Sequence, residues 1–346
     1  MGGDLDHNFD PRHITGDTFQ ALLDYYPATV EAVTRRKATD RVISSKAKGA
    51  KRARQAPASE PGTPEIDDKQ KAQVESEVEA YRALDAFRYE ELPGVVQGRA
   101  SEGGVFLEKE EVVRLVEWKL KHGIFRPTLL GMVKKNQGET VRKSTSDAFA
   151  TALAGQDAGF PKTALENLVK PLRGVGVATA SLLLSVGTSC GPGREEPFYS
   201  DDSYLWVCMR EFPRPRTQLG QDSEECEKRE VRKRAAKFRR PNGELNVKYD
   251  LAEYKMLWTA VTDLRTRLNG SGAGEEAVSC ADVEKVAYVL RYIDVSGYLE
   301  EHELENQGLI PADEDVREAK ANPNIKRKRY EGEKVKGEWD VKKKKT

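Results

Sequence analysis

Hydrophobic residues recur at three- and four-residue steps through much of the chain. One stripe contains Val112, Val116 and Leu120 and ends at Gly123, and a longer one covers residues 251–268. This spacing places apolar side chains on one face of a helix. No stretch shows the sustained alternation that is typical of a half-buried strand. The predicted fold class is all-α, with several helices packed into one domain.

Shorter stripes predict further helices. Ser279 is expected to be the N-cap of a helix that has Asp282 in its first turn. A short amphipathic stretch begins at Thr18 and is expected to end before Pro27. The remaining short stripes predict helices at 127–135, 145–153 and 162–169.

Residues 174–193 contain no charged side chain. Their dense apolar part covers 175–186, which is shorter than the ~20 residues that a membrane-spanning helix needs. We therefore predict a helix buried in the core and no contact with a membrane.

Basic and acidic residues are unevenly distributed along the chain. The chain has 57 Lys+Arg and 57 Asp+Glu, but residues 35–54 are mostly basic, 59–79 are acidic, and 326–329 and 342–345 are runs of Lys and Arg. Basic clusters are typical of nuclear import signals and of arms that contact nucleic-acid phosphates, although solvated tails without a partner also contain them. We expect a nuclear protein that is recognised by the import machinery and that has possible nuclear protein partners.

Segments with few large apolar residues cannot offset the entropy lost on ordering. We therefore expect a short N-terminal helical segment (1–37), a disordered linker that is basic and then acidic (38–79), an all-α domain (80–304) and a disordered basic tail (305–346). A charged insertion is expected within the domain at about 213–245.

Metal-binding and cofactor motifs are not found in the sequence. The four cysteines lie far apart without a CxxC pair, and His122 has no second histidine at a metal-binding spacing. We expect no metal and no cofactor.

The segment with the most specific chemistry lies at 168–184. A helix is expected to end near Pro171, and a Gly-Val-Gly turn leads directly into the uncharged helix. Backbone N–H groups of Gly174, Gly176 and Ala178 can converge at the amino end of that helix, where partial positive charge favours a phosphate oxygen. The candidate phosphate-binding residues are Lys170, Arg173, Gly174, Val175, Gly176, Ala178 and Thr179.

Two other phosphate-binding motifs do not fit this segment. A dinucleotide-binding loop requires a third glycine and a preceding strand, and a Walker loop requires Gly-Lys-Ser/Thr. A tight connection between two helices, without any ligand, remains an alternative.

Residues 172–180 resemble the helix-hairpin-helix motif of the endonuclease III-like DNA glycosylase superfamily, and the similarity extends over roughly residues 165–210. The resemblance implies an all-α fold and a turn that binds a phosphate of double-stranded DNA without reading sequence. Outside this segment, the chain resembles a fungal nuclear protein.

The resemblance also implies a catalytic aspartate some twenty residues after the hairpin, where Asp201 and Asp202 stand. In that superfamily the aspartate stabilises an oxocarbenium-like sugar or activates water. An aromatic wedge such as Tyr199, Phe198 or Trp206 would then lie beside a flipped base. Capping of the next helix by Ser200, Asp201 or Asp202 is the alternative.

Two features of the superfamily are missing. Ala178 stands where its bifunctional members carry a Schiff-base lysine, and no four-cysteine cluster loop is present. If the chain is an enzyme, we therefore expect a DNA N-glycosylase without lysine-dependent lyase activity. The leading hypothesis is a non-catalytic nuclear DNA-binding protein, with a monofunctional glycosylase and a nuclear protein-interaction scaffold as alternatives.

Overall fold

The protein is described by a computed structural model. It describes residues 8–52, 66–123, 125–155, 159–191, 193–215, 246–270, 277–302 and 309–310. The chain divides into two units, 1–312 and 313–346, and the second lies outside the described residues.

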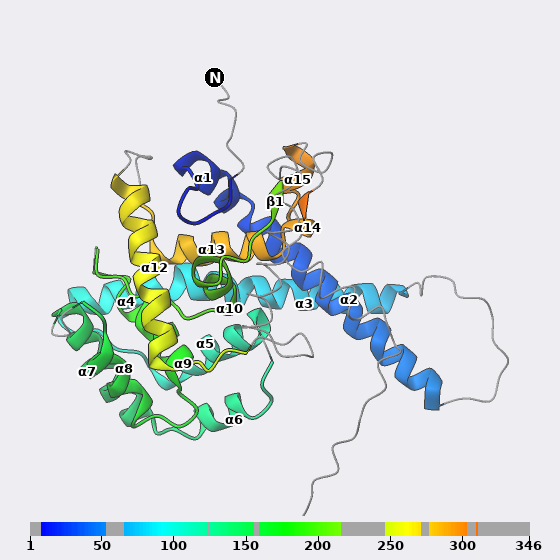
Figure 1. Cartoon of the computed structure of the whole chain (residues 1–346). Helices are drawn as coiled ribbons and strands as arrows, with labels where there is room; N and C mark the ends of the chain where they lie inside the picture. Colours follow the sequence, from blue (N-terminus) through cyan, green and yellow to red (C-terminus); the bar gives the residue numbers. More distant parts are fainter. Residues whose placement is uncertain are drawn as a thin grey trace, which may run out of the picture. The chain divides into compact units, whose positions relative to one another are not determined.

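The described part of the first unit is helical, which confirms the all-α prediction (Figure 1). Its one pair of strands, β1 (Arg214–Pro215) and β2 (Leu309–Ile310), is antiparallel with Arg214 opposite Ile310. Two π-helical turns, η1 (Phe87–Glu91) and η2 (Tyr204–Cys208), continue α-helices. The α-helices are α1 (Gly16–Asp24), α2 (Tyr26–Arg52), α3 (Asp68–Ala86), α4 (Leu92–Ser101), α5 (Lys109–His122), α6 (Leu129–Lys134), α7 (Gly138–Leu153), α8 (Lys162–Val169), α9 (Val177–Gly187), α10 (Asp201–Ser203), α12 (Leu251–Gly270), α13 (Cys280–Arg291), α14 (Ile293–Ser296) and α15 (Tyr298–Glu301).

Helix starts follow local side-chain chemistry. Ser279 caps α13 by accepting a hydrogen bond from the N–H of Asp282, as predicted. Pro27 does not end a helix: α1 ends at Asp24, and Pro27 lies in the first turn of α2. Proline is tolerated in a first turn because the N–H groups there have no intrahelical acceptor.

Helix α1 and the first part of α2 lie in the predicted N-terminal helical segment, and the residues that precede α1 belong to the main core. Phe9 is 1% exposed, and its carbonyl oxygen accepts a hydrogen bond of 2.8 Å from Trp206 Nε1. Arg267 donates to the carbonyl oxygen of Ile14 at 2.8 Å. These bonds join α12 and η2 to the residues that precede α1.

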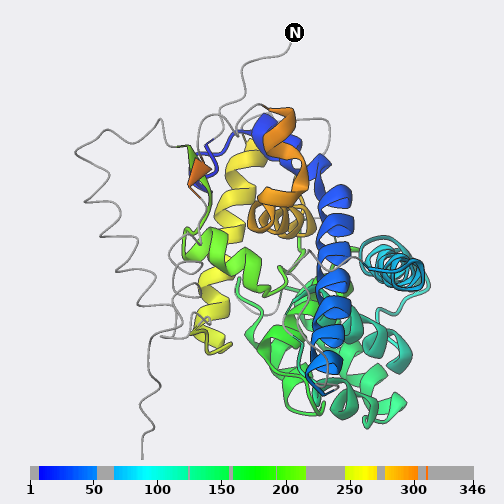
Figure 2. The same cartoon turned by 90° about the vertical axis from the view of Figure 1, so that its right-hand side faces the viewer.

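The predicted linker at 38–79 is largely helical instead. α2 continues to Arg52 and α3 begins at Asp68, and Figure 2 shows the two helices packed together. Their contact buries Ala38, Val42 and Val74 in a small separate cluster. Both helices also pack against other parts of the fold: α2 contacts α13 and α14, and α3 contacts η1 and α5. Residues 53–65, the insertion from 216 to 245 and the tail from 311 lie outside the described residues.

Helix α9 forms the centre of the fold and confirms the predicted core helix. Every residue of α9 except Val177 and Ser185 is buried. Helices α4, α5, α7, α8 and α12 all contact it. Among the described residues, none of the helices combines the length and the apolar character that a membrane span requires.

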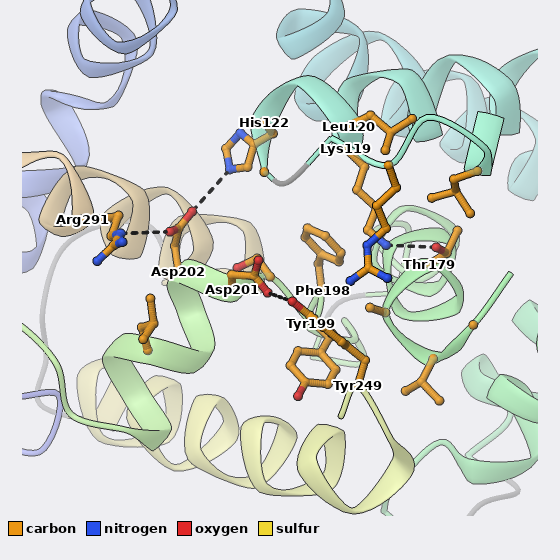
Figure 3. Close-up of a pocket in the computed structure, with 18 of the residues that line it drawn as sticks. Lys119, Leu120, His122, Thr179, Phe198, Tyr199, Asp201, Asp202, Tyr249 and Arg291 are labelled. Atoms are coloured by element: carbon orange, nitrogen blue, oxygen red, sulfur yellow. Dashed lines mark hydrogen bonds and ion pairs between the residues drawn. The ribbon is translucent and has the colours of Figure 1, made fainter. Parts of the chain in front are cut away.

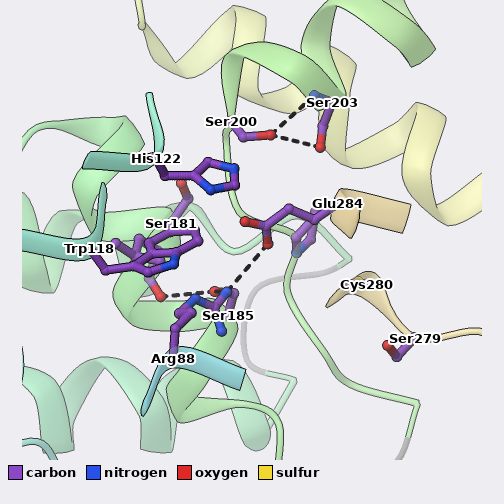
Figure 4. Close-up of polar contacts among 12 residues, drawn as sticks. Arg88, Trp118, His122, Ser181, Ser185, Ser200, Ser203, Ser279, Cys280 and Glu284 are labelled. Atoms are coloured by element: carbon purple, nitrogen blue, oxygen red, sulfur yellow. Dashed lines mark hydrogen bonds and ion pairs between the residues drawn. The ribbon is translucent and has the colours of Figure 1, made fainter. Parts of the chain in front are cut away.

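A buried polar group anchors α9 to its neighbours (Figure 4). Arg88 of η1 donates to Ser185 Oγ at 2.7 Å and to Glu284 Oε2 of α13 at 3.4 Å. The side chains of Arg88 and Glu284 are each 3% exposed. Burial raises the pKa of Glu284 to about 7, against the lowering effect of Arg88. A buried pair of this kind restricts how α9 and α13 can pack because neither charge tolerates losing its partner.

Close approach of α7 and α9 depends on Gly187. A Cβ at this position would overlap the ring of Phe149 in α7. We expect Gly187→Ala to lower the free energy of unfolding by about 1–3 kcal/mol, the usual cost of overpacking. Gly98→Ala in α4, where a Cβ meets nothing within 4 Å, should instead stabilise by up to about 1 kcal/mol. Urea unfolding followed by circular dichroism measures both, and equal stabilities would contradict the close contact.

Candidate functional site

A pocket of about 410 Å³ opens beside the amino end of α9. Its wall combines parts of α5, α9, α10 and α13 with the two residues that precede Asp250. Figure 3 shows these segments, which are distant in sequence, converging on one space. The charged and aromatic lining residues include Lys37, Lys119, Arg126, Lys248, Arg291, Asp201, Asp202, Phe198, Tyr199, Tyr249 and Tyr292.

The turn between α8 and α9 is held by α6. Gly174 adopts the left-handed region at φ +75°, and a Cβ there would lie 3.0 Å from Met132 Cβ. Asn136 accepts from the N–H of Arg173 at 2.8 Å and donates to its carbonyl oxygen at 3.0 Å. A glycine is needed at 174 for both reasons, backbone conformation and the proximity of α6.

The amino end of α9 carries unused hydrogen-bond donors. Gly176 is the N-cap residue, and its carbonyl oxygen accepts from Ala180 at 2.8 Å. Within the described part of the chain, the N–H groups of Gly176, Val177 and Ala178 donate to no acceptor. Gly176 is exposed with nothing within 4 Å of a Cβ built on it, and Gly176, Val177 and Ala178 all line the pocket. A helix start of this kind favours an anion.

Side chains predicted to bind phosphate differ in their placement. Lys170 is exposed but paired with Glu166 at 2.6 Å, and Arg173 is exposed. Val175 is buried in the core at 5% exposure, so only its backbone can face a ligand. Thr179 is also buried, and its hydroxyl group faces the pocket.

Asp201 and Asp202 lie in the pocket, while Ser200 caps α10. Ser200 Oγ accepts from the N–H of Ser203 at 3.1 Å. Ser200 therefore caps α10. The side chains of Asp201 and Asp202 make other contacts. Figure 3 shows Asp201 lying between Asp202 and Thr179 of α9.

Asp201 is held by a tyrosine from the segment before α12. Tyr249 donates its hydroxyl proton to Asp201 Oδ1 at 2.7 Å. The N–H of Tyr249 donates to Glu253 Oε2 at 2.8 Å, and Tyr199 donates its hydroxyl to the same oxygen at 2.9 Å. Arg126 lies 5.2 Å from the centre of the Tyr249 ring. These contacts hold the phenol in place, and the phenol holds the carboxylate.

Asp202 lies in a part of the pocket that is less exposed to solvent than the surroundings of Asp201 and closer to Arg291. Its carboxylate oxygens lie 4.0 Å from His122 Nε2 and 3.9 Å from Arg291 Nε. Burial raises the pKa of Asp202 to about 6, although Arg291 opposes this change. His122 stacks between Trp118 and Tyr288, and its pKa lies well below the ordinary value because burial disfavours the charged ring.

Lys119 of α5 reaches the start of α9. Its Nζ donates to Thr179 Oγ1 at 2.9 Å and lies 6.0 Å from the centre of the Phe198 ring. Burial lowers the pKa of Lys119 to about 8, with Asp201 raising it and Arg126 lowering it further.

Several pocket residues were missed at the sequence level. Lys119, His122 and Tyr249 belong to no sequence motif. The one available signal is the apolar stripe of α5, which places Lys119 and His122 beside residues that are expected to be buried. Of the predicted aromatic wedge, Phe198 and Tyr199 line the pocket. Trp206 does not belong to it, because it is 1% exposed and stacks on Phe19 in the core.

No group of three or more metal-ligating side chains occurs among the described residues. Comparisons with protein-family models, curated proteins and solved structures found no match to this chain.

The buried carboxyl group of Asp202 makes stability depend on pH. Its folded pKa of about 6 exceeds the unfolded value of 3.8, so stability is lost as pH rises through this window. Asp202→Asn, which stays neutral, should therefore be more stable than the wild type by about 3 kcal/mol at pH 8 and by little at pH 3.5.

Thermal unfolding at several pH values measures this difference. Asp263→Asn, which changes an exposed aspartate of α12, is the matched control. A gain for Asp202→Asn that does not vary with pH would contradict the assigned desolvation.

Proposed function

We propose that the protein binds double-stranded DNA at the amino end of α9 and accepts one unstacked nucleotide into the adjacent pocket. The observation that carries this proposal is the adjacency of three features: open backbone donors, a pocket of nucleotide size and two carboxylates.

The donors at Gly176, Val177 and Ala178 suit one phosphate group. They belong to the backbone and sit beside an exposed glycine, so they contact a phosphate without reading a base. The helix-hairpin-helix resemblance of the same residues supports the same assignment. Binding should therefore be independent of sequence and weakened by salt.

The pocket suits a single nucleotide. Its volume of about 410 Å³ falls within the ~300–1,000 Å³ range of small-molecule sites. Aromatic side chains such as Phe198 and Tyr249 offer surfaces against which a base can pack. The cationic lining residues outnumber the two aspartates, which favours a polyanion; they are Lys37, Lys119, Arg126, Lys248 and Arg291.

A second candidate function, base excision, is favoured by the two aspartates. A nucleotide whose phosphate rests on α9 would extend its sugar toward Asp201, the carboxylate that acts on Lys119 at the start of α9. A carboxylate fixed by Tyr249 can stabilise the positive charge that develops on a sugar when its N-glycosidic bond breaks. This supports a monofunctional DNA glycosylase.

The remaining expectations stay predictions. The basic clusters at 326–329 and 342–345 lie outside the described residues, so nuclear location rests on the sequence alone. Because Lys37 lines the pocket, experiments require the whole chain and not residues 80–304.

Gly176→Asp tests the phosphate site. Its backbone is extended, at φ −95° and ψ −179°, and aspartate is a favourable N-cap residue, so the variant should fold. The new carboxylate should repel a phosphate and occupy its donors, which raises the Kd for duplex DNA at least ~10-fold. Fluorescence anisotropy at two salt concentrations measures binding.

Gly98→Asp adds the same charge on α4 and should bind like the wild type. Equal binding by the wild type and Gly176→Asp would contradict the site. No binding by the wild type would contradict the proposed function and favour a protein-interaction scaffold.

Asp201→Asn tests base excision. We would incubate the whole chain with duplexes containing uracil, hypoxanthine, 8-oxoguanine or 3-methyladenine and measure the released base by chromatography. The wild type should release at least one base, and Asp201→Asn should be at least ~100-fold slower because a neutral amide stabilises the sugar cation poorly. Asp263→Asn should retain the wild-type rate. An undiminished rate in Asp201→Asn, or no release by the wild type, would contradict catalysis while leaving DNA binding intact.

A further inference from the structure

We propose that Lys119 is an amine nucleophile that captures the aldehyde of an abasic sugar in this pocket as an imine. The inference rests on the proposed function because it requires that DNA present a sugar to the pocket. It assigns a reactive group to α5, because Ala178 leaves the first turn of α9 without an amine.

The position of Nζ supports this role. The hydrogen bond to Thr179 Oγ1 fixes the end of an otherwise flexible side chain at the start of α9. The same helix start supplies the open donors for a phosphate. A nucleotide bound there therefore brings its sugar close to the amine.

The surroundings of Lys119 are unusual for a structural lysine. No carboxylate forms a salt bridge with it within the described residues. Lys121, on the same helix, is by contrast half exposed and paired with Glu117 at 3.1 Å. Lys119 is partly buried, and a lysine removed from water without a paired charge is unfavourable for stability; such groups are concentrated at functional sites.

Its ionisation also suits nucleophilic attack. Because burial lowers the pKa of Lys119 to about 8, a useful fraction of the amine is neutral near physiological pH. Lys37 also lines the pocket, but its Nζ donates to the carbonyl oxygen of His122 at 3.0 Å and is held against the wall.

The chemistry balances without an added oxidant or reductant. The neutral amine adds to C1′ of the open-chain aldehyde, and a proton moves from nitrogen to the former carbonyl oxygen. Loss of one water molecule from this carbinolamine then forms the C=N bond of the imine. Asp201, which contributes to the charge around Lys119, is placed to accept the second proton from the carbinolamine nitrogen and donate it to the hydroxyl group, which leaves as water.

Borohydride trapping on the whole chain tests the proposal. The probe is a duplex with a preformed abasic site, made by enzymatic removal of uracil, so that base excision is not required. Sodium borohydride donates hydride to an imine and converts it into a stable secondary amine. We expect a covalent protein–DNA band for the wild type and mass-spectrometric assignment of the modified peptide to Lys119.

Lys119→Arg and Lys119→Gln should each lower the trapped yield at least ~20-fold. The arginine keeps the positive charge and long side chain, so its loss of trapping cannot be attributed to lost charge. Lys121→Gln is the matched control on the same helix and should trap like the wild type. The yield should also rise between pH 6 and pH 8, as the amine loses its proton.

Two results would overturn the proposal: trapping that persists in Lys119→Arg, or a wild type that binds the abasic duplex by anisotropy without forming an adduct. Either result leaves DNA binding standing. A wild type that neither binds nor traps contradicts the proposed function itself, so the two failures are distinguishable.

Discussion

Helix α9 contains no charged side chain, and almost all of it must be removed from water. Five other helices contact it, and the buried group of Arg88, Ser185 and Glu284 attaches it to η1 and α13. Its first turn is different because the glycines before it leave the backbone uncovered. The burial of nearly the whole helix thus determines where the core lies, and its uncovered first turn is the polar end that reaches the pocket.

The pocket at this end combines groups that are unfavourable to bury. Asp202 and Lys119 both have their pKa values shifted toward neutrality by loss of hydration. A fold selected only for stability would place such groups at the surface. Their concentration beside open backbone donors is the physical reason to assign a function to this part of the molecule.

Regular features of the fold could be predicted from the chain. The uncharged helix, the Ser279 cap and the all-α class follow from local periodicity and capping chemistry. Predictions that depended on neighbours were wrong. Pro27 lies in the first turn of α2 and does not end a helix, and α3 covers Ala38 and Val42 of a segment that was expected to be disordered.

For the site, the sequence by itself determined the glycine turn, the amphipathic face of each helix and the presence of two adjacent aspartates after α9. Only the tertiary structure decided that Ser200 does the capping, that Tyr249 holds Asp201, and that Lys119 reaches Thr179. Periodicity shows which face of a helix is apolar but not which helix lies opposite it. Desolvation and proximity, the two properties that make a side chain reactive, depend on those neighbours.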